Sequence, residues 1–101
     1  MSDTYHNRLA SLRQRFQDRA TAESETLQQI VLDLERGAPA AQLEREIRRI
    51  THSLAGAAGT FGFAGISARA VALEEIVLDM PDSPELVGAC RTLISEIERA
   101  T

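Results

Sequence analysis

Lysine and tryptophan are absent from this sequence of 101 residues, and aromatic side chains make up only 4% of it. A core with so few aromatic rings must be built from Leu, Ile, Val and Ala, which suits packed helices. All 11 basic residues are arginine, so no lysine is available for a functional role. Cys90 is the single cysteine, which excludes an intrachain disulfide.

The sequence also lacks a long apolar run, a basic surplus and a signal-peptide pattern. No run approaches the roughly 20 apolar residues that span a membrane. The first residues, Met1 to Thr4, do not have the pattern of a signal peptide. The formal net charge of −4 argues against a nucleic-acid-binding protein, which usually has a basic surplus. We therefore expect a single cytoplasmic domain over residues 1–101, with no nucleic-acid or membrane partner.

Glycine and proline are few, and most of them gather at three breaks in the chain. Between the breaks, apolar residues recur at spacings of three and four, which is the period of an amphipathic helix. The sequence predicts helices over roughly 3–18, 21–36, 40–58, 66–80 and from 83 onward. No strong breaker separates the first two segments, which are either two helices or one bent helix.

Four or five amphipathic helices joined by short loops predict an all-α antiparallel bundle. No run alternates apolar and polar residues with the period of a strand. Gly37 is expected to end the second segment in a left-handed turn, and Ser83 to cap the last helix. We place Cys90 in the core, and Phe61 and Phe63 at the bundle end beneath a glycine-rich turn. The apolar faces suffice to close the bundle, so we expect a monomer.

One histidine lies on the polar side of the segment over residues 40–58. At about 100° per residue, the apolar residues of this segment fall within about 60° of arc. They are Leu43, Ile47, Ile50 and Leu54. His52 lies about 180° from the centre of this stripe, so we expect its side chain to point away from the core. The other histidine, His6, is isolated near the N-terminus and is expected to be exposed.

A glycine and three arginines share the polar side with His52. Gly56 lies one turn after His52, although a helical glycine costs about 1 kcal/mol relative to alanine. The glycine indicates either close packing against a neighbouring helix or clearance for another protein that approaches the imidazole. Arg45, Arg48 and Arg49 form either a solvated basic face or a functional cluster of positive charge.

The run from His52 to Phe63, HSLAGAAGTFGF, resembles the phosphorylation motif of histidine phosphotransfer domains. The family pattern reads His-x-Leu-Lys-Gly, often followed by a Gly-x-Phe-Gly turn. The resemblance implies a four-helix bundle with an additional N-terminal helix. It also implies a phosphocarrier that accepts a phosphoryl group at Nε2 of His52 and exchanges it with a receiver-domain aspartate or a histidine kinase. Such a carrier has no cofactor of its own, and Mg²⁺ is expected in the receiver.

The resemblance also assigns roles to residues around His52. In family members a polar residue 22 positions after the histidine orients the ring through Nδ1–H, and here that residue is Glu74. The family's lysine is replaced by Ala55, which makes Arg48 or Arg49 the candidate for positive charge beside the phosphoryl group. Partner docking is expected on apolar side chains around His52, such as Ala55 and the exposed edges of the first helix.

Three hypotheses for the function follow. The first is a phosphorelay carrier. The second is an atypical phosphoacceptor domain of a chemotaxis-type histidine kinase, because the glycine turn resembles that class as well. Such domains typically carry the lysine and a second histidine, where this chain has Ala55 and Val71. The third is a non-phosphorylated helical adaptor. No glycine-rich nucleotide loop is visible, so we expect no kinase activity of the chain itself.

Overall fold

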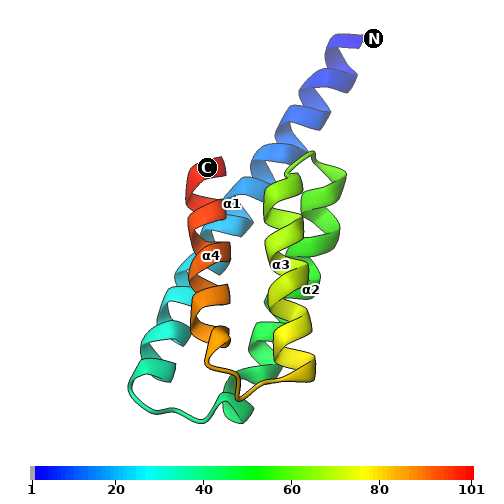
Figure 1. Ribbon diagram of the computed structural model, residues 1–101. Helices are drawn as coiled ribbons and strands as arrows, with labels where there is room; N and C mark the ends of the chain where they lie inside the picture. Colours follow the sequence, from blue (N-terminus) through cyan, green and yellow to red (C-terminus); the bar gives the residue numbers. More distant parts are fainter. Residues whose placement is uncertain (1) are drawn as a thin grey trace.

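The computed structural model describes residues 2–101, which form four helices and no strand. The helices are α1 (Ser2–Glu35), α2 (Ala40–Thr60), α3 (Ala64–Asp79) and α4 (Glu85–Ala100). Figure 1 shows that successive helices run in opposite directions, so that α2 and α3 lie side by side and α4 returns along α1. The predicted all-α antiparallel bundle is therefore confirmed.

The prediction of an additional, separate N-terminal helix is wrong, because that segment forms the first half of α1. The helix continues through residues 19–24, where no glycine or proline interrupts it. Ser24 sits in that stretch, and its hydroxyl donates to the Thr21 carbonyl at 2.9 Å, a bond made inside the helix. The chain therefore has four helices, the first of them 34 residues long.

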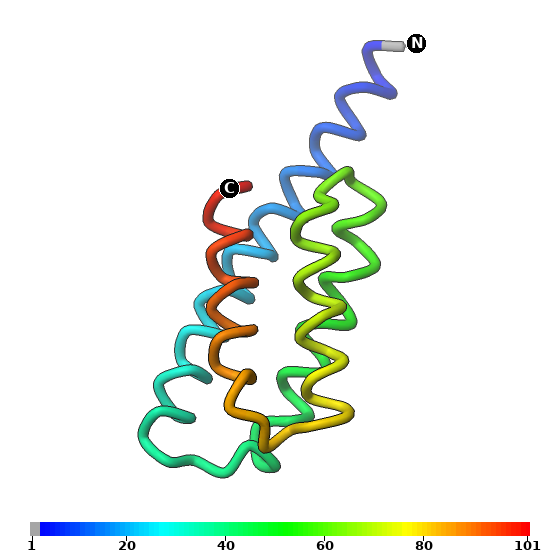
Figure 2. The backbone as a smooth tube through the Cα atoms, in the orientation of Figure 1, coloured from blue at the N-terminus to red at the C-terminus, as the bar shows by residue number. Residues whose placement is uncertain are grey.

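The N-terminal part of α1 projects beyond the end of the bundle (Figures 1 and 2). Tyr5 is 62% exposed, and Leu9 and Leu12 are each 40% exposed. Phe16, the next apolar residue at the same helical spacing, is buried. The apolar stripe of α1 thus continues past the point where α2, α3 and α4 can cover it.

Two glycines end helices in the left-handed conformation, Gly37 after α1 (φ 96°) and Gly62 after α2 (φ 84°). At the second turn, Phe63 N–H donates to the Ala58 carbonyl at 2.8 Å and Gly62 N–H to the Gly59 carbonyl at 3.4 Å. The same pair of bonds forms around Gly37, and together they satisfy the last carbonyls of each helix. The predicted role of Gly37 is confirmed, since a positive φ favours glycine.

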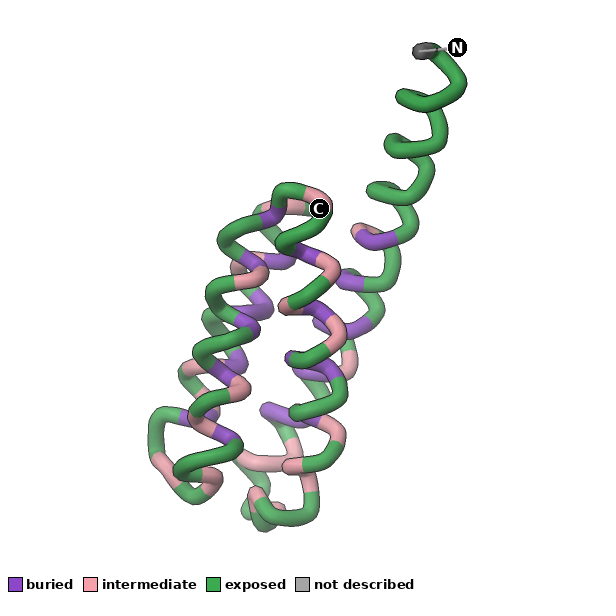
Figure 3. Tube along the Cα trace, turned by 90° about the vertical axis from the view of Figure 1, so that its right-hand side faces the viewer, coloured by how far each residue is buried: buried purple, intermediate pink, exposed green. Residues whose placement is uncertain are grey.

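The core consists almost entirely of aliphatic side chains from all four helices. In Figure 3, buried positions recur along each helix of the bundle. The buried residues of α2 are Ile47, Ile50, Thr51, Leu54 and Ala58. Thr51 is the polar member, and its hydroxyl donates to the Arg48 carbonyl at 3.1 Å. Burial of this face fixes the rotation of α2 about its axis, and with it the direction in which the opposite face points.

The three phenylalanines gather at the end of the bundle, as predicted for Phe61 and Phe63. The ring of Phe16 lies 5.9 Å from that of Phe61 and 5.3 Å from that of Phe63, between ring centroids. Cys90 is buried in the core, and desolvation raises the pKa of its thiol to about 11. Within residues 2–101, no helix is both long enough and apolar enough to cross a membrane.

Candidate functional site

His52 stands on the outer face of α2 with its side chain 87% exposed. Its chain neighbour Thr51 and the nearby Leu54 are buried completely, so the backbone on which the imidazole stands is anchored in the core. The side chain points away from the core, as the helical periodicity predicts. His52 is thus an accessible imidazole on a fixed support, whereas the exposed His6 stands in the projecting part of α1.

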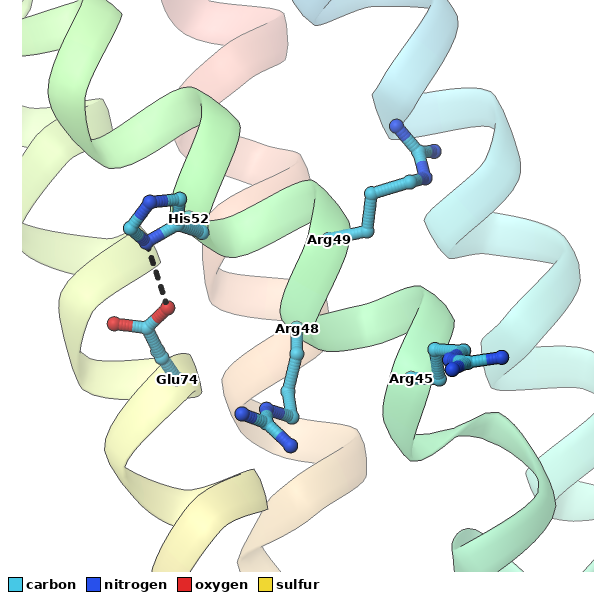
Figure 4. Close-up of a pocket in the computed structure, with 5 residues that line it drawn as sticks. All are labelled: Arg45, Arg48, Arg49, His52 and Glu74. Atoms are coloured by element: carbon cyan, nitrogen blue, oxygen red, sulfur yellow. Dashed lines mark ion pairs between the residues drawn. The ribbon is translucent and has the colours of Figure 1, made fainter.

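Glu74 of α3 lies beside the imidazole (Figure 4). Its Oε2 is 3.6 Å from Nδ1 of His52, which is longer than an ordinary hydrogen bond. A carboxylate at this place favours the tautomer with the proton on Nδ1, and the lone pair then resides on Nε2. Nε2 lies on the side of the ring away from Glu74, where an incoming electrophile can reach it.

His52 and Glu74 share a hollow of about 330 Å³ with the three arginines of α2. Arg49 reaches toward α1 (Figure 4), where its guanidinium donates to both carboxylate oxygens of Glu23 at 3.0 and 3.1 Å. It also donates to both oxygens of Glu46, at 2.9 and 3.2 Å. Hydrogen bonds from Arg49 lower the pKa of Glu46, and those two carboxylates raise the pKa of Arg49. The charge of Arg49 is therefore already neutralised.

The other two arginines remain available to an incoming anion. Arg48 is half-exposed, and its nearest carboxylate oxygen, on Glu44, is 3.7 Å away. An exposed pair of this kind contributes little in water. Arg45 is exposed and forms no ion pair with any residue of the described chain. Of the two candidates for phosphate-side charge, Arg48 is thus free to move, whereas Arg49 is held.

Gly56 is open to solvent one turn above His52. A Cβ built at this position would meet no atom within 4 Å beyond its own helix. Close packing against a neighbouring helix is therefore excluded as the reason for the glycine, and its φ is not positive either. At Gly59, one turn further along, an added Cβ would make an ordinary contact with Ser67 Oγ at 3.8 Å. The backbone on this side of His52 is bare.

Some contacts around the site were not predicted from the sequence. Ser67 Oγ donates to the Ala55 carbonyl at 2.9 Å and ties α3 to α2 beside His52. Glu23 interrupts the apolar stripe of α1. Because a carboxylate on a buried face needs a partner, this interruption could have predicted a pairing of Glu23 with an arginine. Glu46 stands three residues before Arg49, a spacing at which helical side chains meet.

The residues around His52 suit an anion better than a metal ion. Across residues 2–101, no three His, Cys, Asp or Glu side chains come together as metal ligands would. The hollow instead combines one imidazole, one carboxylate and three guanidinium groups. Guanidinium groups bind phosphate through charge-assisted hydrogen bonds, which makes phosphate chemistry the fitting interpretation.

The ion pair between Arg49 and Glu23 connects α2 to α1, and its removal should destabilise the fold. We expect Arg49→Gln to lower the free energy of unfolding by about 1–2 kcal/mol, because the side chain of Glu23 is only 12% exposed and loses its partner. Arg49 itself is half-exposed, so the loss is smaller than for a fully buried pair. Urea denaturation measures this change.

The control for this prediction is Arg69→Gln, which removes an exposed arginine of α3 and should change stability by less than about 0.5 kcal/mol. Because the pKa of Glu46 is lowered in the folded state, its contribution is present above its unfolded pKa and is lost as the pH falls through the folded one. The difference between Arg49→Gln and the wild type should therefore shrink below about pH 4. Equal stabilities of both variants at pH 7 would contradict a structural role for the pair.

The comparisons with known proteins point to one family. A family model described as Hpt domain matches residues 11–100, which is nearly the whole chain. Neither the comparison with curated proteins nor that with solved structures gives a match. The matched range includes the hollow around His52 and begins after the exposed Tyr5 and Leu9 of α1.

Proposed function

Because this chain belongs to the Hpt domain family, we propose that it carries a phosphoryl group on His52 in two-component signalling and exchanges it with the aspartate of a receiver domain. The observation that carries this proposal is the exposed imidazole of His52 with the Glu74 carboxylate at its Nδ1. That arrangement supports a lone pair at Nε2, which is what an attack on phosphorus requires.

In the proposed step, the Nε2 lone pair of His52 attacks the phosphorus of an aspartyl phosphate on the partner. A P–N bond forms, the P–O bond to the aspartate breaks, and the carboxylate leaves with the electron pair. Nδ1 keeps its proton, so the phosphorylated ring becomes cationic. Glu74 stabilises that positive charge, as a carboxylate beside an imidazolium does. Reversal of the same step returns the phosphoryl group.

The partner would supply the rest of the chemistry. A receiver brings the aspartate and its Mg²⁺, and electrostatic stabilisation of the transferring group comes largely from that side. Under this proposal the chain has no ATP site, and kinase activity belongs to another chain or domain. The carrier contributes an oriented nucleophile and a surface on which the partner docks.

The proposed docking surface includes the part of α1 that projects past the bundle. Leu9 and Leu12 are exposed there, and a second hollow forms where this part of α1 meets the end of α2. Its lining residues are Leu9, Ala10, Arg13, Thr60 and Phe61. Ala55 is half-buried, so only part of its side chain is available to a partner. Transient signalling interfaces are small, so a docking surface limited to these residues and the surroundings of His52 would suffice.

The role of Glu74 can be measured with a small phosphoryl donor. We expect Glu74→Ala to slow phosphorylation of His52 by phosphoramidate about tenfold, because the ring loses the carboxylate that favours the proton on Nδ1 and stabilises the cationic phosphorylated ring. A tenfold change in rate corresponds to about 1.4 kcal/mol in the barrier. Glu75→Ala is the matched control, because Glu75 is the exposed neighbour on α3 and does not line the hollow. Equal rates for the two variants would remove Glu74 from the mechanism.

The proposal itself is tested by a phosphotransfer profile of the wild-type chain. Purified chain is incubated with each phosphorylated receiver and each active histidine kinase of the source cell, and labelling is followed over time. We expect an acid-labile label that passes to and from at least one receiver. Loading by a kinase core without exchange with any receiver would favour the chemotaxis-type alternative. No label with any competent donor would leave the adaptor hypothesis.

A further inference from the structure

We propose that Arg45 and Arg48 form a cationic docking surface that selects an acidic partner and fixes which way round the partner sits on His52. This inference rests on the proposed function of His52 and adds to it the chemistry and the orientation of the partner. It follows from which arginines are free, where they stand along α2, and what charge surrounds them.

The first step separates free from engaged positive charge. All three arginines of α2 line the hollow around His52, but the guanidinium of Arg49 is held by two carboxylates. Arg48 has only a 3.7 Å contact with Glu44, and Arg45 has no carboxylate partner among residues 2–101. Two cations on this face are therefore open to a partner.

The second step is the uneven distribution of these groups along α2. Arg48 lies about 6 Å and Arg45 about 10 Å along the helix axis on the N-terminal side of His52, at 1.5 Å per residue. On the C-terminal side Gly56 and Gly59 offer bare backbone. Figure 4 shows the arginines on one side of the imidazole along α2. The outer face of α2 is thus cationic before His52 and uncharged after it.

The third step concerns the charge of the whole chain. Its formal net charge is −4, and Glu74 and Glu75 stand on α3, the helix next to α2. A partner that presents a reactive carboxylate and holds Mg²⁺ with carboxylates is itself acidic at its reactive face. Since facing like charges oppose docking, such a partner needs a local positive surface to approach His52. Arg45 and Arg48 supply that surface.

These three steps together give a docking orientation. The acidic rim of the partner's reactive site lies over Arg45 and Arg48, and its closest backbone approach is over Gly56. In the opposite orientation the acidic rim would face bare backbone and leave both arginines without partners. Charges at the rim of an interface act mainly on the rate of encounter and on its dependence on salt. The chemical step at His52 is left largely unchanged.

The test compares a protein partner with a small donor. The variants are Arg45→Gln, Arg48→Gln and their combination, with Arg69→Gln as the control, an exposed arginine of α3 outside the hollow. The protein partner is the receiver of the source cell that exchanges phosphate fastest with the wild type, and the small donor is phosphoramidate. Both kcat/KM and kcat are measured at 20 mM and 500 mM salt.

We expect the double variant to lose about tenfold in kcat/KM with the receiver at low salt, with kcat changed less than about twofold. The loss should nearly vanish at high salt, and the loss with phosphoramidate should be much smaller than the loss with the receiver. Each single variant should lose about threefold, since each removes one of two charges. Arg69→Gln should behave as the wild type throughout.

Other outcomes would overturn the inference in distinguishable ways. Wild-type kcat/KM of the double variant with the receiver at low salt would remove the docking role and leave phosphorylation of His52 standing. An equal loss with phosphoramidate would assign the arginines to the phosphoryl group instead of the partner. A wild-type chain that takes phosphate from neither donor would overturn the proposed function of His52 and this inference with it.

Discussion

His52→Gln abolishes phosphorylation of the chain from every donor and leaves the fold intact. Glutamine has a size and polarity similar to those of histidine, but its amide nitrogen has no lone pair available for attack on phosphorus. The wild-type side chain is 87% exposed, so its replacement should change the free energy of unfolding by less than about 0.5 kcal/mol. Loss of the label therefore reports loss of the nucleophile.

The measurement is labelling by the best protein donor and by phosphoramidate, together with urea denaturation of the same samples. His6→Gln is the matched control, because His6 is the only other histidine and is also exposed. It should keep the full label. Labelling of His52→Gln at the wild-type rate would place the phosphoryl group elsewhere and would end the proposal. A variant that loses the label and also unfolds is replaced by His52→Asn, for which the same result is expected.

The position of His52 could be predicted because one helix carries both the core stripe and the histidine. The apolar residues of α2 recur with the helical period, so the direction opposite to them is determined by geometry alone. The structure confirms that Ile47, Ile50 and Leu54 are buried and that His52 is exposed. No information about the neighbouring helices is needed for this result.

The extent of α1 could not be predicted in the same way. Tyr5, Leu9 and Leu12 have the helical spacing of buried residues, yet they are exposed because α2 ends at Thr60 and α4 at Ala100. Whether an apolar stripe is covered depends on where the other helices end. The spacing of residues within α1 gives no information about that. The absence of a breaker at residues 19–24 permits a continuous helix but does not require one.

The roles of the arginines needed the tertiary structure. In the sequence, Arg48 and Arg49 are equivalent candidates one turn before His52. The structure separates them, because Glu23 lies 26 residues away from Arg49 in the chain and reaches it only when α1 packs beside α2. Gly56 is a similar case, since close packing against a neighbouring helix and clearance for a partner protein both predict a glycine at this position. Only the empty space around its backbone decides between them.

Gly56→Leu should make the chain more stable and its phosphotransfer to a receiver much slower. Leucine is the better helix former by about 0.8 kcal/mol, and the open space at this position lets the helix accept it without a clash. A helical side chain leans toward the N-terminus, over the residue one turn before it, which here is His52. Since displacements of about 1 Å in a reacting complex can cost about 100-fold, we expect a loss of about that size.

The change in stability and the change in rate are separated by a second glycine. Gly88 of α4 is also helical and exposed, and an added Cβ there would likewise meet no atom within 4 Å. Gly88→Leu should therefore gain the same stability and transfer phosphate at the wild-type rate. Phosphoramidate is small enough to reach Nε2 from the side, so Gly56→Leu should lose far less with this donor than with the receiver. If Gly56→Leu is stabilised and transfers normally to the receiver, the bare backbone above His52 does not serve the approach of a partner.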